Sequence, residues 1–155
     1  MRIEMRVRAT LLAALGIASL VAASPLDNAA IVNSGSTNSY GYTIDVASDG
    51  KASVTLGESG TPASTPKPFI VPAATTARFF ADLAAARKGN AATVPCMKSA
   101  SFGTSLHVTW QGWTYPDHSC PPKDALGEAL VKDVDAIRQA GGIPAMPLRQ
   151  HPQTP

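Results

Sequence analysis

Apolar and polar side chains alternate along two neighbouring segments in the first half of the chain. Residues 40–46 carry an apolar side chain at every second position, and residues 52–56 resume the same alternation. A period of two is typical of a half-buried strand. The pair Asp49 and Gly50 lies between the segments, and a glycine supplies the positive φ that a tight turn needs. The pattern therefore predicts an antiparallel hairpin.

The apolar period lengthens to that of a helix after Pro72. Phe79 and Leu83 fall on one helical face, and two basic residues precede Gly89. A proline is tolerated at the start of a helix, whereas basic residues and glycine are favoured at its end. These signals predict a helix over residues 73–88.

A second helical pattern follows the second cysteine. Its apolar side chains recur at intervals of three or four positions, namely Leu126, Leu130, Val134 and Ile137. Asp124 precedes them, where an acidic residue is favoured, and Gly141 with Gly142 ends the pattern. The pattern predicts an amphipathic helix between these polar and glycine signals.

Two further strands are predicted between the helices. Residues 106–110 alternate between apolar and polar, and the pair Gln111 and Gly112 offers a turn into a short strand over residues 113–115. The order of elements predicts an α+β fold, an antiparallel sheet of about four strands with both helices packed on one face (ββαββα).

Three stretches show neither period. Residues 24–38 are small and polar, which predicts a flexible leader with at most a short edge strand at 30–32. Residues 57–68 are rich in Gly, Pro, Ser and Thr and are expected to add nothing to the core. Residues 143–155 contain four prolines, which predicts a Pro-rich disordered tail. A single domain is therefore expected over residues 39–142.

The N-terminal segment has the composition of a secretory signal peptide. Three arginines within the first eight residues precede an apolar block that ends at Ala23. The block is shorter than the roughly 20 apolar residues that a bilayer demands. We expect cleavage after Ala23, with Met1 or Met5 as the start, and no membrane span after cleavage. The protein is then secreted or periplasmic.

Charge and motif content narrow the classes of partner. Removal of residues 1–23 leaves ten basic and ten acidic residues, without a basic run. This balance argues against nucleic acid and anionic membrane surfaces, so an unidentified protein or glycan is the expected partner. No glycine spacing of a phosphate-binding loop and no zinc-type pair of Cys or His occurs. No cofactor or metal is expected, and the oligomeric state stays open.

Cys96 and Cys120 are the only two cysteines. In an exported chain an even pair is expected to form a disulfide. The loop so closed, of about 25 residues, would stabilise the fold by about 3.5 kcal/mol in the chain-entropy model. Both tryptophans and two of the three histidines also lie between the cysteines, which makes this interval the centre of the functional analysis.

Side chains able to bind a ligand gather in and around this interval. The candidate ligand-binding surface consists of Lys98, Ser99, Ser101, His107, Trp113, Tyr115, Asp117 and His118. Trp110 shares the apolar face of its strand and is expected in the core. Trp113 and Tyr115 lie near a turn and are expected to be the exposed aromatic pair.

The interval is compatible with three kinds of function. The first is a non-catalytic binding or interaction module, with no catalytic residue. The second is a hydrolase or metal-dependent enzyme that uses His107, His118 and Asp117, although adjacent loop residues point in different directions and a catalytic triad depends on geometry. The third is a proteinase-inhibitor-like module that presents residues 115–119 as a disulfide-braced loop.

Several segments together resemble small exported bacterial proteins of uncharacterised function. These are Cys-Met-Lys-Ser-Ala-Ser-Phe-Gly-Thr-Ser at 96–105, Ser-Cys-Pro at 119–121, the helical segment 130–137 and the strand at 40–50 that ends in Asp-Gly. The resemblance covers about residues 31–143. It implies the same architecture and compartment and transfers no catalytic residue, so the non-catalytic binding module remains the leading expectation.

Overall fold

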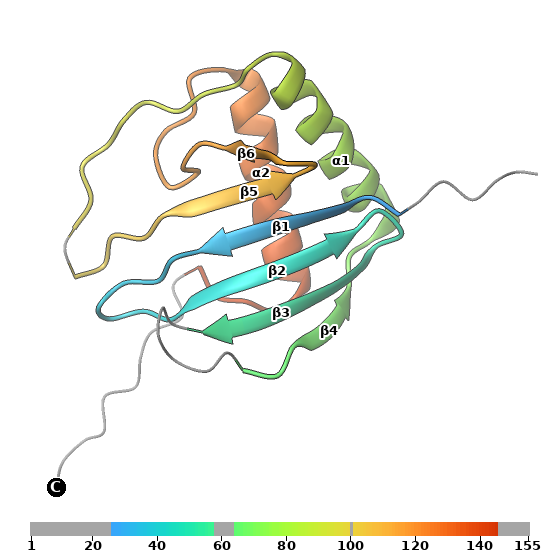
Figure 1. Cartoon of the computed structure of the whole chain (residues 1–155), viewed down its shortest axis with the longest axis horizontal. Coiled ribbons are helices and arrows are strands. Elements are labelled where there is room, and N and C mark those ends of the chain that lie inside the picture. The colour runs from blue at the N-terminus through green and yellow to red at the C-terminus, as the bar shows by residue number, and fades with distance from the viewer. Residues whose placement is uncertain (1–25, 58–63, 100, 146–155) are drawn as a thin grey trace, which may run out of the picture.

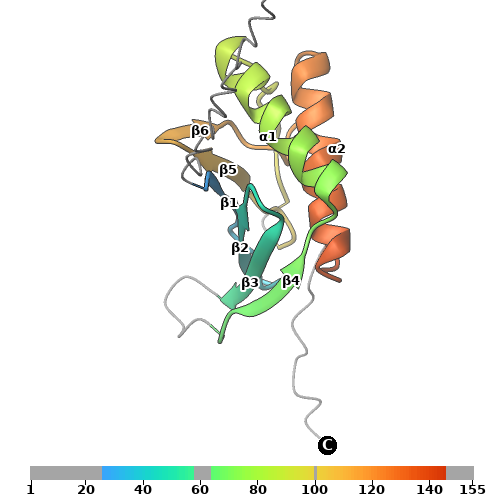
Figure 2. The same cartoon turned by 90° about the vertical axis from the view of Figure 1, so that its right-hand side faces the viewer.

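The computed structural model describes residues 26–57, 64–99 and 101–145. They form two layers, a β-sheet and a pair of helices packed on one of its faces (Figure 1; Figure 2). The α+β class and the two helices are confirmed, but the sheet has six strands and not about four. In chain order the elements are β1 (Asn28–Asn33), β2 (Gly41–Ala47), β3 (Lys51–Gly57), β4 (Lys67–Ile70), α1 (Ala73–Lys88), β5 (Leu106–Trp110), β6 (Trp113–Tyr115) and α2 (Ala125–Ala140).

The predicted flexible leader contains β1, which lies inside the sheet. The strand order is β4-β3-β2-β1-β5-β6, and all neighbours are antiparallel. Ile31 of β1 pairs with Ile44 of β2 on one side and with Val108 of β5 on the other. The prediction of a leader with an edge strand is therefore wrong for β1. Ala30 and Val32, on the opposite face, are also apolar and hide the period of two.

The edge strand β4 begins at the end of residues 57–68, the segment predicted to add nothing to the core, and the two residues that they share, Lys67 and Pro68, are exposed. This edge strand pairs Phe69 with Ala52 of β3, and Phe69 packs against the core. Pro68 is tolerated there because an edge strand has one side without a partner strand. Val71, directly after β4, is buried and donates its backbone N–H to Gly50 O at 2.9 Å. This strand has four residues, which is too few for an alternation of apolar and polar side chains to be recognised in the sequence.

The core lies between the sheet and the two helices. The bounds of α1 agree with the predicted helix, and Phe79 and Leu83 are fully buried. In α2, Leu130 and Ile137 are fully buried as well. The side chain of Asp124 caps α2 by accepting a hydrogen bond from Gly127 N at 2.9 Å, which satisfies one of the free amides of the first turn.

The two predicted terminal segments fall largely outside the described residues. This holds for the signal peptide, residues 1–23, and for the Pro-rich tail after residue 145. The start of the predicted tail is ordered, because Ile143 is buried and its carbonyl accepts a hydrogen bond from Arg138 Nη1 at 2.7 Å. Neither helix of the described part is long and apolar enough to cross a membrane.

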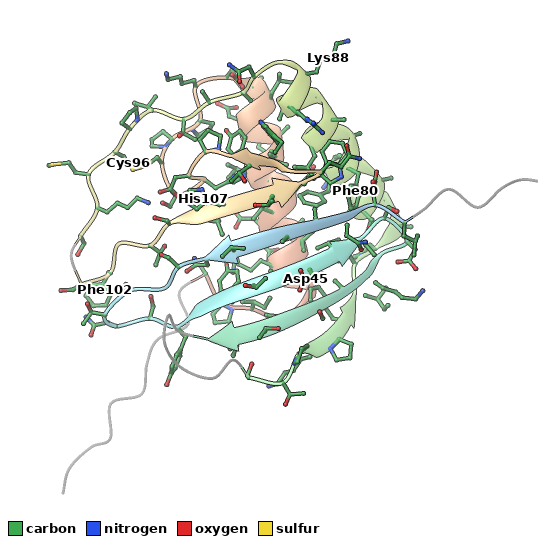
Figure 3. All side chains as sticks on the ribbon, viewed as in Figure 1. Asp45, Phe80, Lys88, Cys96, Phe102 and His107 are labelled. Atoms are coloured by element: carbon green, nitrogen blue, oxygen red, sulfur yellow. A yellow bond between two sulfur atoms is a disulfide. The ribbon has the colours of Figure 1, made fainter. Side chains whose placement is uncertain are left out.

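The sheet has one face that neither helix covers, which we call the open face. Figure 3 shows Asp45 and His107 on this side of the sheet. Cross-strand pairing places Val32 of β1 between Thr43 and His107, and Ala30 between Asp45 and Thr109. Most of these side chains are short, and several are polar, which is the usual composition of a solvated sheet face.

Candidate functional site

The predicted disulfide is present and joins two loops. Cys96 lies between α1 and β5, Cys120 lies between β6 and α2, and their Cα atoms are 5.5 Å apart. Beside it the same loops form an antiparallel bridge between Thr93 and Pro122, with Val94 N donating to Pro121 O at 2.8 Å. We call residues 94–99 the braced segment and residues 116–122 the supporting loop. Figure 1 shows the chain from α1 to β5 passing along the edge of the molecule beyond β6.

The braced segment exposes its apolar side chains to solvent. Met97 is fully exposed, with a relative accessibility of 101%, and Val94 is 46% exposed. Phe102, just beyond the segment, is 47% exposed. Residues 94–99 belong to no helix or strand. The backbone N–H groups of residues 96–98 donate no hydrogen bond to any other described residue, so they are available to a partner chain.

A shallow pocket of about 290 Å³ lies next to Met97. It is lined by Cys96, Met97, Lys98, Ser99, Phe102, Gly103, Thr104 and Ser119. The apolar wall comes from the two exposed side chains Met97 and Phe102, while Lys98 and Ser119 form the polar wall. Figure 3 labels Cys96 and Phe102 at the same end of the molecule. This end therefore combines exposed apolar groups with a rigid covalent support.

Lys98 folds back from the braced segment onto the supporting loop. Its ammonium donates to Thr104 O at 2.7 Å and to Ser105 Oγ at 3.3 Å, and it forms an ion pair with the carboxylate of Asp117. About a quarter of the Lys98 side chain is exposed (26%). Because a partly buried ammonium needs acceptors to offset lost hydration, this geometry fixes the direction of the Lys98 side chain.

Asp117 is held in place by four groups. Its carboxylate accepts hydrogen bonds from Leu106 N at 2.9 Å, Ser119 N at 3.0 Å and Ser119 Oγ at 2.6 Å, in addition to the ion pair with Lys98. Partial burial disfavours the charged carboxylate, but the bonds from Lys98, Ser119 and the Leu106 amide outweigh burial and lower the pKa of Asp117. Asp117 thus stays ionised and ties the start of β5 to the supporting loop.

His118 belongs to the supporting loop and is only 7% exposed. Its ring is 4.3 Å from the ring of Tyr115, and neither ring nitrogen has a hydrogen-bond partner among the described residues. Burial lowers the pKa of His118 to about 4, against a smaller opposing effect of Asp117. The imidazole is therefore neutral at pH 7 and contributes to packing.

The prediction that Tyr115 is exposed is wrong. Its side chain is fully buried, since Tyr115 pairs with Val108 and points to the helical layer. A Cβ atom on Gly127 of α2 would lie 2.5 Å from the Tyr115 hydroxyl, so this glycine makes room for the ring. Trp113 is half-buried, and its ring is 6.0 Å from that of Tyr115. Trp110 is buried in the core, as expected.

The remaining candidate residues are spread over separate surfaces. Ser99 and Ser101 are exposed in the chain leading to β5, where Ser99 Oγ accepts a hydrogen bond from Ser101 N at 3.3 Å. His107 lies on the open face, half-buried. The structure brings Lys98 and Asp117 into contact, but neither ring nitrogen of His118 donates a hydrogen bond to the Asp117 carboxylate. No cluster of His, Cys, Asp and Glu suited to a metal ion occurs within the described part of the chain.

A larger cavity, of about 450 Å³, lies on the outer side of the helices. It is lined by Arg78, Asp82, Ala125, Glu128, Ala129 and Lys132. Arg78 forms an ion pair with the buried carboxylate of Asp133, and burial together with Asp82 raises the pKa of Asp133. The lining carries charges of both signs, and its only apolar side chains are alanines. We therefore interpret this cavity as part of the contact between the two helices and not as a ligand site.

Sequence reasoning did not include Met97 or Ser119 in the candidate surface. Met97 carries no local signal of its exposure, because residues 94–99 belong to no helix or strand and its neighbours are fixed by partners more than 18 positions later in the chain. The chain matches no protein-family model, and searches of curated proteins and of solved structures find no significant match. The function is therefore argued from the geometry of this chain.

Proposed function

We propose that this protein is an exported, non-catalytic binding module of the proteinase-inhibitor kind, and that it offers the braced segment to a serine proteinase. The observation that carries the proposal is Met97, which is fully exposed between two fixed neighbours, Cys96 in the disulfide and Lys98 in the ion pair. Met97 also lines one pocket together with the exposed Phe102, and apolar side chains that gather at one exposed place mark an interaction surface more often than single ones do.

A proteinase recognises a short segment of chain by two kinds of contact. Backbone groups pair with the edge of the active-site cleft, and one side chain enters the primary specificity pocket. The amides of residues 96–98, which donate no hydrogen bond to another described residue, supply the first contact, and the Met97 side chain supplies the second. A methionine suits an apolar pocket of the chymotrypsin or subtilisin type, whereas a pocket with an aspartate favours a basic side chain.

Rigidity distinguishes an inhibitor from a substrate. Ordering a flexible segment on binding opposes association, and bracing that segment in advance removes much of this free-energy cost. Here the disulfide, the Thr93–Pro122 bridge and the Lys98–Asp117 ion pair hold the segment before a partner arrives. Complexes of proteinases with such inhibitors typically form with little backbone movement.

The segment proposed from sequence for this role, residues 115–119, has a different place. Tyr115 and His118 are buried, and Asp117 bonds to β5. This segment supports the presented one.

A disulfide also fits an oxidising compartment outside the cytoplasm, which agrees with secretion or export to the periplasm as part of the proposal.

The test measures inhibition constants of the purified protein against subtilisin, chymotrypsin and trypsin. We expect inhibition of subtilisin or chymotrypsin, and we expect Met97→Ala to weaken it by about 30-fold or more, since truncating a central anchor typically costs at least 2 kcal/mol. Met97→Lys should transfer inhibition towards trypsin.

The matched control is Ile70→Ala, because Ile70 is also a large exposed apolar residue, 69% accessible, but lies on β4 far along the sheet order from β6. It should leave every inhibition constant unchanged. Absence of inhibition across the three proteinases, or equal inhibition by wild type and Met97→Ala, would overturn the proposal.

A further inference from the structure

We propose that Lys98 is a positioning residue that keeps the two chain ends together when a proteinase cuts the bond between Met97 and Lys98, so that the bond can close again. This inference rests on the proposed function and adds a specific role for the Lys98–Asp117 ion pair.

The two neighbours of Met97 are attached to the same supporting loop. Cys96 is joined covalently to Cys120, and Lys98 is paired with Asp117. Cys120 and Asp117 are themselves linked, since Cys120 N donates to Asp117 O at 3.1 Å. The presented bond is therefore spanned from both sides by one short, ordered piece of chain.

The Lys98 attachment is stronger than a simple surface ion pair. Its ammonium also bonds to Thr104 O at 2.7 Å, and its partner Asp117 is fixed by Leu106 N at 2.9 Å. The Lys98 and Asp117 side chains are only 26% and 20% exposed, so solvent screens the pair less than an exposed one. Ser119 Oγ lies 2.6 Å from the Asp117 carboxylate and completes the group.

The chemistry of cleavage shows why this attachment matters. The proteinase serine oxygen attacks the Met97 carbonyl carbon, the bond to the Lys98 nitrogen breaks, and that nitrogen leaves as an amine with a proton from the catalytic histidine. Water then attacks the acyl ester and gives a Met97 carboxylate. In the reverse direction the new α-amino group of Lys98, which is distinct from its side-chain ammonium, attacks the same ester carbon, releases the serine oxygen and restores the peptide bond.

The ratio of intact to cleaved protein depends on where the α-amino group of Lys98 stays after the bond breaks. A leaving group held next to the ester reacts as part of the same molecule, at a far higher effective concentration than a free amine would have. The disulfide alone holds only the Met97 side. The ion pair holds the Lys98 side, so the amine remains beside the ester, competes with water and keeps the intact inhibitor favoured.

The experiment compares wild type with Lys98→Met, which keeps an unbranched apolar stem and removes the ammonium. Each protein is incubated with a trace of subtilisin or chymotrypsin, starting from intact and from cleaved material, and mass spectrometry after reduction gives the cleaved fraction at equilibrium. We expect wild type to converge on a mainly intact mixture from both sides. We expect Lys98→Met to raise the ratio of cleaved to intact protein at least tenfold. Inhibition by this variant should then be temporary, because the proteinase regains activity as the inhibitor is cleaved.

Two further variants separate positioning from general stability. Lys98→Arg, which can still pair with Asp117, should restore most of the wild-type ratio. Lys123→Met removes an exposed lysine from the other side of Cys120 and should change nothing. The midpoints of thermal unfolding of all variants should agree within a few degrees, because the ion pair joins two loops outside the hydrophobic core.

The outcomes distinguish the two proposals. If wild type inhibits no proteinase, the proposed function fails. If wild type inhibits but Lys98→Met shows the same cleaved fraction and lasting inhibition, the role of Lys98 is wrong while the function stands. Cleavage after Lys98 in place of Met97, together with inhibition of trypsin, would also overturn this role, because Lys98 would then enter the proteinase pocket.

Discussion

The braced segment and the open face are both left uncovered by the rest of the described chain, but their chemistry differs. The braced segment exposes large apolar groups, with Met97 fully accessible. The open face mainly presents short side chains such as Thr43, Ala30 and Thr109, and its most exposed large apolar residue among the central strands is Val32, at 37%. A solvated sheet face needs no partner, whereas apolar side chains that gather at one exposed place, as Met97 and Phe102 do, indicate one.

The two regions also differ in how they are held. Each central strand of the open face is supported by ladders on both sides, so no single side chain fixes its position. The braced segment has no ladder and depends on one disulfide, one isolated bridge and one ion pair. Single substitutions should therefore disturb the braced segment strongly and the open face weakly, which makes the contrast testable.

The largest effect is expected from removing the disulfide by the double substitution Cys96→Ser and Cys120→Ser. The cysteines are 24 positions apart, and the chain-entropy model predicts a loss of about 3.5 kcal/mol in the free energy of unfolding. Urea denaturation should show a lower midpoint, and inhibition should be lost at temperatures where the variant is still folded. Equal midpoints for the variant and wild type would show that the loops are held without the bond.

The next effect concerns His118, the buried histidine of the supporting loop. The folded state lowers its pKa to about 4 from the ordinary 6.5. As the pH falls from 6.5 towards 4, the unfolded chain takes up a proton that the folded chain refuses, so stability decreases over this window and levels off below it. The loss from this group at pH 4.5 should be on the order of 2 to 3 kcal/mol.

His118→Phe should remove that loss, because the ring of His118 makes no hydrogen bond to a described residue and packs against Tyr115. The measurement is urea denaturation of wild type and variant at pH 7 and pH 4.5. Carboxylates such as Asp117 titrate in both proteins, so the difference between the two curves isolates His118. A parallel decline in both proteins would mean that His118 is not buried in solution.

Much of this contrast could be predicted from the sequence, but not its functional centre. The hairpin around Gly50, the span of α1 and the strand ending at Trp110 follow from local periods and turn residues, which act over a few positions. The disulfide follows from composition and compartment. These features need no knowledge of which strands become neighbours.

What escaped prediction depends on distant partners. β1 is a central strand only because β2 and β5 pair with it, and its own apolar residues on both faces give no clear period. Tyr115 is buried because Gly127 leaves room for it in α2. The exposure of Met97 follows from the contact of Lys98 with Asp117, 19 positions later. Such facts become visible only when the chain is folded.

The smallest effect is expected on the open face, from Asp45→Asn. Asp45 is exposed and lies in a row with Ala30 of β1 and Ser53 of β3, and substitutions at such positions usually change stability by less than about 0.5 kcal/mol. Inhibition constants and the cleaved fraction at equilibrium should stay at wild-type values. Asp45 belongs to the open face, whereas the proteinase is expected to contact only the braced segment and the residues around it. A change in inhibition with Asp45→Asn, at unchanged stability, would place part of the docking surface on the sheet and remove the distinction between the two regions.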